Sequence, residues 1–166
     1  MSAETVLSDY AREEINRWVA KFPDGRQRSA LLSALQVAQH ENGGYLTTEI
    51  MDAVAEYLNL QPIQVYEVAT FYSMFETKPV GRHSISVCTN ISCMLRGADE
   101  IVRHLEKRLG IQLGENTADG KFYLKVEEEC LAACCGAPMM VVDHQYYENL
   151  TPQKVDEVIG KLEKQD

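Results

Sequence analysis

Four of the five cysteines form two closely spaced pairs, and this grouping constrains the chain more than any other feature. The first pair is Cys88 and Cys93, in a C-x4-C interval, and the second is Cys130 and Cys134, in a C-x3-C interval. Thiolates repel one another and lose solvation when they gather, so a group of four needs a cation to neutralise it. The sequence therefore predicts a metal or redox site built from two separate segments.

The charge distribution argues against binding to nucleic acid. Residues 1–80 carry 6 basic and 11 acidic side chains, and residues 81–166 carry 10 and 14, so both halves are acidic. No apolar run approaches the length needed to cross a bilayer, and the acidic N-terminal segment resembles neither a signal peptide nor a transit peptide. We expect a cytoplasmic bacterial protein, or a mature organellar form, with no direct membrane insertion and with reduced thiols.

The first part of the chain is predicted to be helical. Apolar residues recur at helical spacing four times between residues 1 and 78, with turns at Gly25, at Gly43-Gly44 and before Pro62. Four short helices with brief connections make a small bundle, which we assign to residues 1–78. The aromatic residues of the fourth helix are interpreted as helix–helix core, with a docking surface as the alternative: Tyr66, Phe71, Tyr72 and Phe75.

After a joint at residues 77–81 the pattern changes to mixed strands and helices. Alternating or apolar runs predict strands over 83–89, 122–126, 139–142 and 145–148, and helical stripes cover 97–109 and the segment that begins at Thr151. The order β-α-β-β-β-α is that of a thioredoxin-like domain over residues 79–166, so the predicted fold class is α+β. Such domains often hold a cis proline where Pro138 stands, although base rates favour a trans bond.

This layout predicts that the two cysteine pairs converge. Cys88 ends the first strand, Cys93 lies in the following loop, and Cys130 and Cys134 lie in the loop after the second strand. If these two strands are adjacent and parallel, both loops emerge at the same edge of the sheet. The thiols would then meet although 37 positions separate Cys93 from Cys130.

The spacing of the cysteines favours a [2Fe–2S] cluster. Its two irons each need two thiolates, whereas structural zinc sites generally use tighter C-x2-C turns. Zinc, thiol redox chemistry and simple burial stay as alternatives. Cys135 is either a buried neighbour of the site or a ligand in place of Cys134, and we take Cys134 as the ligand. Small and amide residues in both loops would let backbone N–H groups approach the sulfurs.

Both loops also resemble a known family. CTNISCMLRG at 88–97 and CLAACCGAPMM at 130–140 resemble the binding loops of the thioredoxin-like [2Fe–2S] ferredoxins. With VYEVATFYSMF at 65–75, the chain resembles, over nearly its whole length, the members that serve as small subunits (bacterial E chains) of respiratory complex I, an NADH-quinone oxidoreductase. Carried over residue by residue, the resemblance implies the ligands Cys88, Cys93, Cys130 and Cys134, with Cys135 as a non-ligand.

The resemblance also implies a function in electron transfer. The protein would carry one [2Fe–2S] cluster and exchange single electrons with the flavin of an NADH-binding partner subunit. This chain has no Gly-rich dinucleotide loop, so FMN and NADH would bind that partner, and no catalytic residue is expected here. The expected partners are the flavin- and NADH-binding subunit and the large iron–sulfur subunit of the same module. The expected location is the cytoplasmic side of the inner membrane, reached through the complex.

Three other functions are compatible with parts of the sequence. The chain could be the equivalent small subunit of an NAD-linked hydrogenase or formate dehydrogenase, or a zinc-stabilised interaction module. A third alternative, an iron–sulfur transcription regulator with a helix-turn-helix over 51–75, is disfavoured because the second helix begins without basic residues and carries Glu67.

Charged and imidazole groups near the cysteines also bear on the site. Glu127, Glu128 and Glu129 would oppose cluster reduction if they lie close to it, and otherwise form a solvated acidic edge. The histidines are expected to be surface or hydrogen-bonded groups rather than Rieske-type ligands: His40, His83, His104 and His144.

Overall fold

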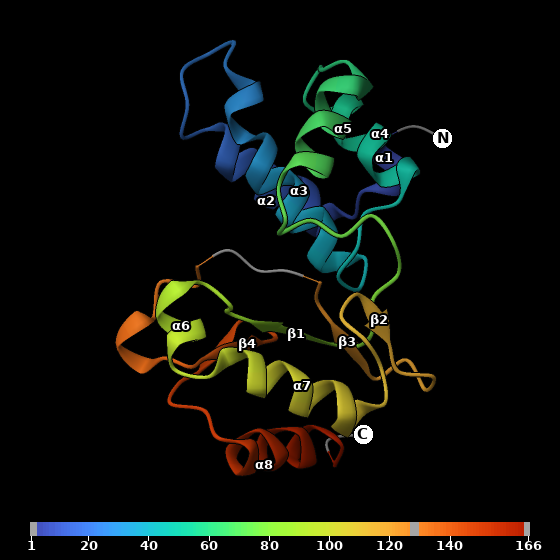
Figure 1. Cartoon of the computed structure of the whole chain (residues 1–166). Coiled ribbons are helices and arrows are strands. Elements are labelled where there is room, and N and C mark those ends of the chain that lie inside the picture. The colour runs from blue at the N-terminus through green and yellow to red at the C-terminus, as the bar shows by residue number, and fades with distance from the viewer. Residues whose placement is uncertain (1–2, 127–129, 165–166) are drawn as a thin grey trace. The chain divides into compact units, whose positions relative to one another are not determined.

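The computed structural model describes residues 3–126 and 130–164, and the chain divides into two compact units (Figure 1). The first unit comprises Met1–Pro79 and the second comprises Val80–Asp166. Each unit has a hydrophobic core of its own. Among the described residues, no helix is both long and apolar enough to cross a lipid bilayer.

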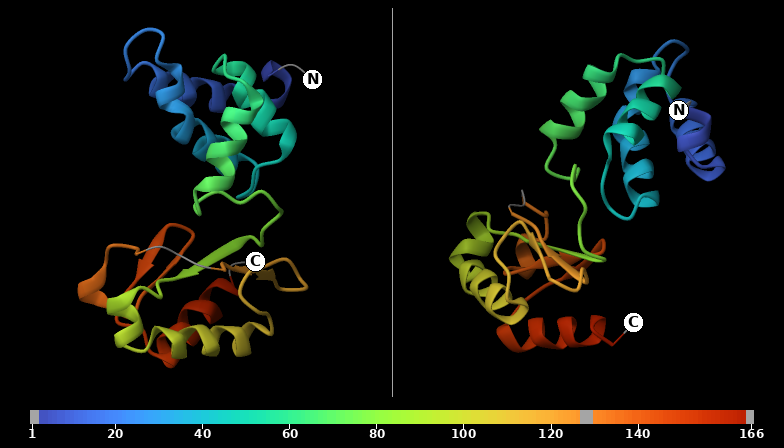
Figure 2. Two further views of the ribbon diagram at one scale, coloured as in Figure 1. Left: turned by 45° about the horizontal axis from the view of Figure 1, so that its top comes forward. Right: turned by 90° about the vertical axis from the view of Figure 1, so that its right-hand side faces the viewer.

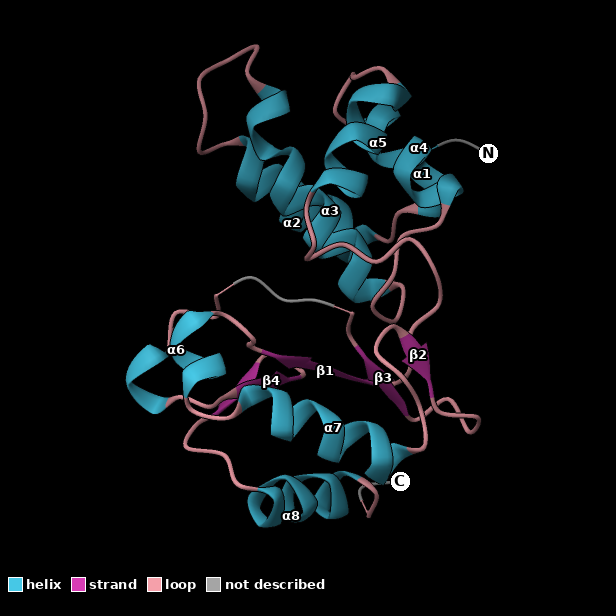
Figure 3. Cartoon of the chain, viewed as in Figure 1, coloured by secondary structure: helices cyan, strands magenta, loops and turns pink. Residues whose placement is uncertain are grey.

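The first unit is built from short helices joined by turns (Figure 3). They are α1 Ala3–Val6, α2 Asp9–Val19, the 3-10 helix η1 Gln27–Ala30, α3 Leu31–Glu41, α4 Thr48–Tyr57 and α5 Pro62–Phe71. Local sequence explains where α2 and α4 begin. The Ser8 hydroxyl accepts the N–H of Ala11 at 3.0 Å, and the Thr47 hydroxyl accepts the N–H of Ile50 at 3.2 Å. Each bond satisfies a donor that the helix itself leaves unpaired.

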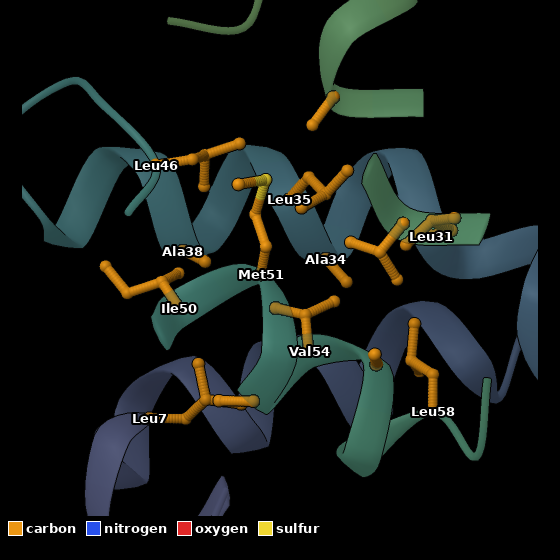
Figure 4. Packing of buried hydrophobic residues seen from close by; sticks show 14 of the residues in the cluster. Leu7, Leu31, Ala34, Leu35, Ala38, Leu46, Ile50, Met51, Val54 and Leu58 are labelled. Carbon is orange, nitrogen blue, oxygen red and sulfur yellow. The ribbon is translucent and has the colours of Figure 1, made fainter. Parts of the chain in front are cut away.

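Aliphatic side chains from α2 to α5 form the core of this unit. Ile15, Leu35, Val54 and Val65 are fully buried. Figure 4 shows that Leu35 of α3 and Val54 of α4 point into the same apolar layer. The amphipathic stripes predicted from the sequence are therefore the surfaces along which the helices pack.

The predicted aromatic core of α5 is only partly correct. Phe75 is buried, but Phe71 is 80% exposed and Tyr72 is 39% exposed. The helix buries only Val65 and Ala69 and ends at Phe71, because Tyr72 already has extended backbone angles. Helical spacing had placed all four aromatic residues on one face, but Tyr72 and Phe75 lie beyond the end of the helix.

The second unit is a sheet with helices (Figure 1). Its elements are β1 His83–Val87, α6 Ile91–Leu95, α7 Ala98–Leu109, β2 Glu115–Asn116, β3 Phe122–Leu124, the 3-10 helix η2 Cys134–Gly136, β4 Met140–Val142, β5 Gln145–Tyr147 and α8 Pro152–Leu162. The strand order is β2-β3-β1-β4-β5. β1 and β3 are parallel, whereas the other neighbouring strands are antiparallel.

The predicted α+β class is confirmed, and besides the 3-10 helix η2 the second unit adds two short elements to the predicted order. The first, β2, pairs with β3 at the sheet edge within a polar segment that shows no alternation of apolar residues. The second, α6, is capped by Asn90, whose side chain accepts the N–H of Ile91. Both elements are too short to show a hydrophobic period in the sequence.

Two helices cover one face of the sheet. Figures 1 and 2 show α7 and α8 side by side along it. Their apolar faces pack with β1, β3 and β4, and Leu105, Val155 and Ile159 are fully buried. Towards solvent, His104 contacts Asp156 at 2.9 Å and holds the two helices together. This packing fixes the frame from which the cysteine loops emerge.

The sequence predicted one of two turns of the second unit correctly and the other incorrectly. The expected hairpin around Asp143-His144 is present, with φ of 48° and 67° at these residues, as a two-residue hairpin turn requires. The bond from Ala137 to Pro138 is cis, so the trans expectation was wrong.

Candidate metal centre

The parallel pairing of β1 with β3 carries both cysteine loops to one edge of the sheet. Cys88 is the first residue after β1, and its N–H donates to the Met139 carbonyl at 3.1 Å. Cys130 lies in the segment after β3, and Cys134 begins η2. Cys93 was expected in a loop but lies in the short helix α6. The predicted adjacency of the two strands is confirmed.

The thiols interact with one another across the two loops. The Cys130 and Cys134 sulfurs are 3.6 Å apart. Cys88 has hydrogen-bonding contacts with Cys93 in its own loop and with Cys130 in the other loop. Cys93 in turn is close enough to Cys134 to be affected by its charge. Contacts among the thiols therefore involve Cys88, Cys93, Cys130 and Cys134, and their role as ligands stays a prediction.

The two pairs differ in exposure. Cys88 and Cys93 are 2% and 1% exposed and pack against Ala98, Ala137 and Met139. Cys130 and Cys134 are exposed. One pair thus forms the inner wall of the site, and the other forms its outer rim.

Backbone N–H groups donate to the sulfurs, which the sequence could only suggest. Burial alone would raise the pKa of Cys88, but hydrogen bonds from the N–H groups of Leu131 and Asn90 and from the neighbouring thiols outweigh it and lower that pKa. The Leu131 donor comes from the second loop, so this bond ties the two loops together. Such N–H bonds to cysteine sulfur are a recognised means of stabilising thiolate ligands.

Two other thiols of the set, those of Cys93 and Cys130, are harder to ionise. Burial and the adjacent Cys88 raise the pKa of Cys93 to about 11, against a smaller opposing effect of the Met139 N–H. The Ala132 N–H lowers the pKa of Cys130, but hydrogen bonding to Cys134, some desolvation and the charge of neighbouring thiols raise it overall. A cation bound at the site would favour the deprotonated forms of Cys93 and Cys130.

These properties predict an order of thiol reactivity in the cluster-free protein. At pH 8 only about one Cys93 in a thousand is a thiolate, because its pKa is about 11. We expect iodoacetamide to modify Cys93 at least about 100-fold more slowly than the exposed Cys135, with a rate that rises with pH up to about 11. Peptide mapping after timed alkylation measures both rates. Equal rates at pH 8 would contradict this account.

Cys135 lies outside this group of interacting thiols. It is exposed, and the contacts described among the thiols involve Cys88, Cys93, Cys130 and Cys134. In residues 3–126 and 130–164, no group of three or more His, Cys, Asp or Glu side chains is arranged to hold a single metal ion. The contacts described within the site link Cys88 to Cys93 and to Cys130, and Cys130 to Cys134.

Within the second unit, His83 and His104 contact carboxylates away from the thiols. His83 contacts Asp143 at 2.5 Å and begins β1, whereas Cys88 follows the end of that strand. His104 contacts Asp156 between α7 and α8. The segment Glu127, Glu128 and Glu129 lies outside the described residues.

Comparison with known proteins identifies the family of this chain. The family model for thioredoxin-like [2Fe-2S] ferredoxins matches residues 15–163. The chain belongs to this family. The match covers both units of the chain, so the helical unit is part of the family pattern and not an unrelated addition.

Similar sequences within this family come from bacteria and from mitochondria. The chain is 46% identical over 144 residues to the E subunit of NADH-quinone oxidoreductase from Rickettsia bellii, covering 87% of this chain and 86% of that protein. It is 41% identical over 157 residues to the mitochondrial NADH dehydrogenase [ubiquinone] flavoprotein 2 of Dictyostelium discoideum, covering 93% of this chain and 63% of that protein.

Solved structures share the fold of this ferredoxin-family chain. An NAD+-reducing [NiFe]-hydrogenase in the air-oxidised state matches with a TM-score of 0.69 and 24% identity, over 81% of this chain and 23% of the hydrogenase chain. The H2-reduced state gives a TM-score of 0.70. This chain thus spans less than a quarter of the hydrogenase chain, and at this identity the likeness concerns the fold alone.

Proposed function

We propose that this chain is the electron-transfer subunit of an NADH-quinone oxidoreductase and holds one [2Fe–2S] cluster on Cys88, Cys93, Cys130 and Cys134. The observation that carries the proposal is the meeting of two thiol pairs at one sheet edge in a member of a [2Fe–2S] family. The E subunits of the Rickettsia enzymes, which match along 86% of their length, support the assignment to this complex.

The donor set suits two irons better than one zinc ion. Two pairs of thiolates from two loops supply two ligands per iron, whereas a structural zinc needs four donors around one point. Backbone N–H groups already face the sulfurs, as a site for an anionic cluster requires.

The residues of the chain have distinct tasks in this proposal. When bound, the cluster supplies one-electron transfer. Cys88 and Cys93 would hold its inner side, fixed by the end of β1 and by α6, and Cys130 and Cys134 would hold its outer side. The Leu131 N–H stabilises the Cys88 thiolate and keeps the outer loop against the inner one.

The partner subunits belong to the same proposal. FMN and NADH would bind a flavin-containing partner, and a large iron–sulfur subunit would complete the module on the cytoplasmic side of the membrane. Ile91 and Leu95 support the presence of a partner near the site, because they flank Cys93 on α6 and are 67% and 76% exposed. Exposed apolar side chains next to a redox site are typical of a surface that another protein covers.

Metal and sulfide analysis of the anaerobically purified protein tests the proposal. We expect about two irons and two acid-labile sulfides per chain, a red-brown colour, and a one-electron paramagnetic signal after reduction with dithionite. One zinc ion per chain without sulfide would instead support the zinc-stabilised module.

A further inference from the structure

The two outer thiols, those of Cys130 and Cys134, are close enough to form a disulfide bond with each other when no iron is present. The Cys130 and Cys134 sulfurs are 3.6 Å apart and both residues are exposed. A disulfide bond measures about 2.05 Å, so the sulfurs need to approach by only about 1.5 Å. Cys130 lies in an irregular segment and Cys134 in the three-residue helix η2, so no strand ladder opposes this movement.

The inner pair is much less accessible to a dissolved oxidant, because Cys88 and Cys93 are buried. Cys88 follows the central strand β1, and its sulfur accepts the N–H groups of Asn90 and Leu131. Cys93 is 1% exposed. A dissolved oxidant therefore reaches the outer thiols long before the inner ones.

We propose that Cys130 and Cys134 form a disulfide in the cluster-free protein and thereby gate cluster assembly according to the thiol redox state. The inference rests on the proposed ligand set. The oxidant is a small-molecule disulfide such as oxidised glutathione. One outer thiolate attacks it, forms a mixed disulfide and releases one thiol, and the second outer thiolate then displaces the other thiol. Two protein thiols are oxidised, and one small disulfide is reduced to two thiols.

The disulfide leaves two of the four proposed ligands unable to bind iron. A thiolate binds iron, but a sulfur in a disulfide carries no such charge. The inner thiols stay reduced, so the protein keeps one half of the site and regains the other half on reduction. An oxidised chain would thus remain folded but unable to receive a cluster.

Thiol mapping of the cluster-free, full-length chain tests the proposal. The protein is equilibrated anaerobically in glutathione redox buffers, quenched by alkylation after unfolding, and digested with trypsin. Cys88 and Cys93 fall on the tryptic peptide 83–96, and the other three cysteines fall on the peptide 126–154. The oxidation state of the two sets is therefore determined separately. We expect both thiols of the first peptide to be alkylated, and the second peptide to carry one disulfide and one alkylated thiol at Cys135.

Cluster transfer from a [2Fe–2S] donor protein without added thiol provides the second measurement. We expect uptake by the oxidised chain to be at least about tenfold slower than uptake after reduction with a phosphine. Cys135→Ser is the matched control and should behave as the wild type in both measurements, whereas Cys134→Ser should lack the disulfide.

Two outcomes would overturn the proposal. One is a disulfide that includes Cys88, Cys93 or Cys135. The other is three free thiols on 126–154 in a buffer that oxidises a reference dithiol. Iron and sulfide in the starting protein are measured separately, so a failure of the proposed function is distinguishable from a failure of this inference.

Discussion

Replacing Cys130 with alanine is expected to reduce the iron and acid-labile sulfide content to below about one tenth of the wild-type value. One iron would keep a single protein thiolate instead of two, and a [2Fe–2S] cluster depends on four cysteine ligands. Cys130 is exposed, so the substitution removes a ligand without leaving a cavity in a core. Iron and sulfide assays, visible absorption and the paramagnetic signal after reduction measure the loss.

Cys135→Ala is the matched control for this substitution. Cys135 lies beside Cys134 and is likewise exposed. We expect the variant to retain the full iron content. If Cys135→Ala lost the cluster and Cys134→Ala kept it, Cys135 would be the ligand and the choice between these neighbours would be wrong.

Gly81→Ala is expected to destabilise the second unit by about 3 kcal/mol, the upper end of what overpacking generally costs. A Cβ at this position would lie 2.5 Å from the carbonyl carbon of Phe122 and 2.8 Å from the backbone nitrogen of Tyr123. These are backbone atoms of β3, so they cannot rotate away as a side chain would. The Gly81 N–H also donates to the Asn116 side chain at 2.6 Å, which further limits movement.

Gly160→Ala in α8 provides a control of the same chemistry. An added Cβ there meets nothing within 4 Å, and alanine favours a helix over glycine by about 0.5–1 kcal/mol. Urea denaturation of both variants in the same cofactor state should therefore shift the midpoint in opposite directions. A Gly81→Ala protein as stable as the wild type would mean that β3 can move away from residue 81.

Periodicity and residue type predicted most of the fold and the thiol group. The long helices α3, α4, α7 and α8 have clear apolar stripes and terminal signals, and β1 has an alternating pattern, so each could be located in the sequence. The convergence of the cysteines required only that β1 and β3 be parallel neighbours, which followed from the β-α-β order.

The remainder depended on contacts that no local pattern records. The bonds from the Leu131 and Met139 N–H groups to sulfur arise from the backbone path of a loop, and residue type does not encode them. The exposure of Phe71 was missed because helical spacing says nothing about where a helix ends. The short helix around Cys93 has too few residues to show a period.

The position of β1 has a consequence for how this protein tolerates the loss of its cofactor. This strand is paired on both sides, with β3 and with β4, and it ends directly before Cys88. The inner half of the site therefore begins directly at the end of a doubly paired strand, whereas the outer half lies in an irregular segment and in the short helix η2. In the cluster-free protein, the segment that carries Cys130 and Cys134 should become mobile before the sheet does. The strands should keep their register, so that a cluster can bind again without refolding of the sheet.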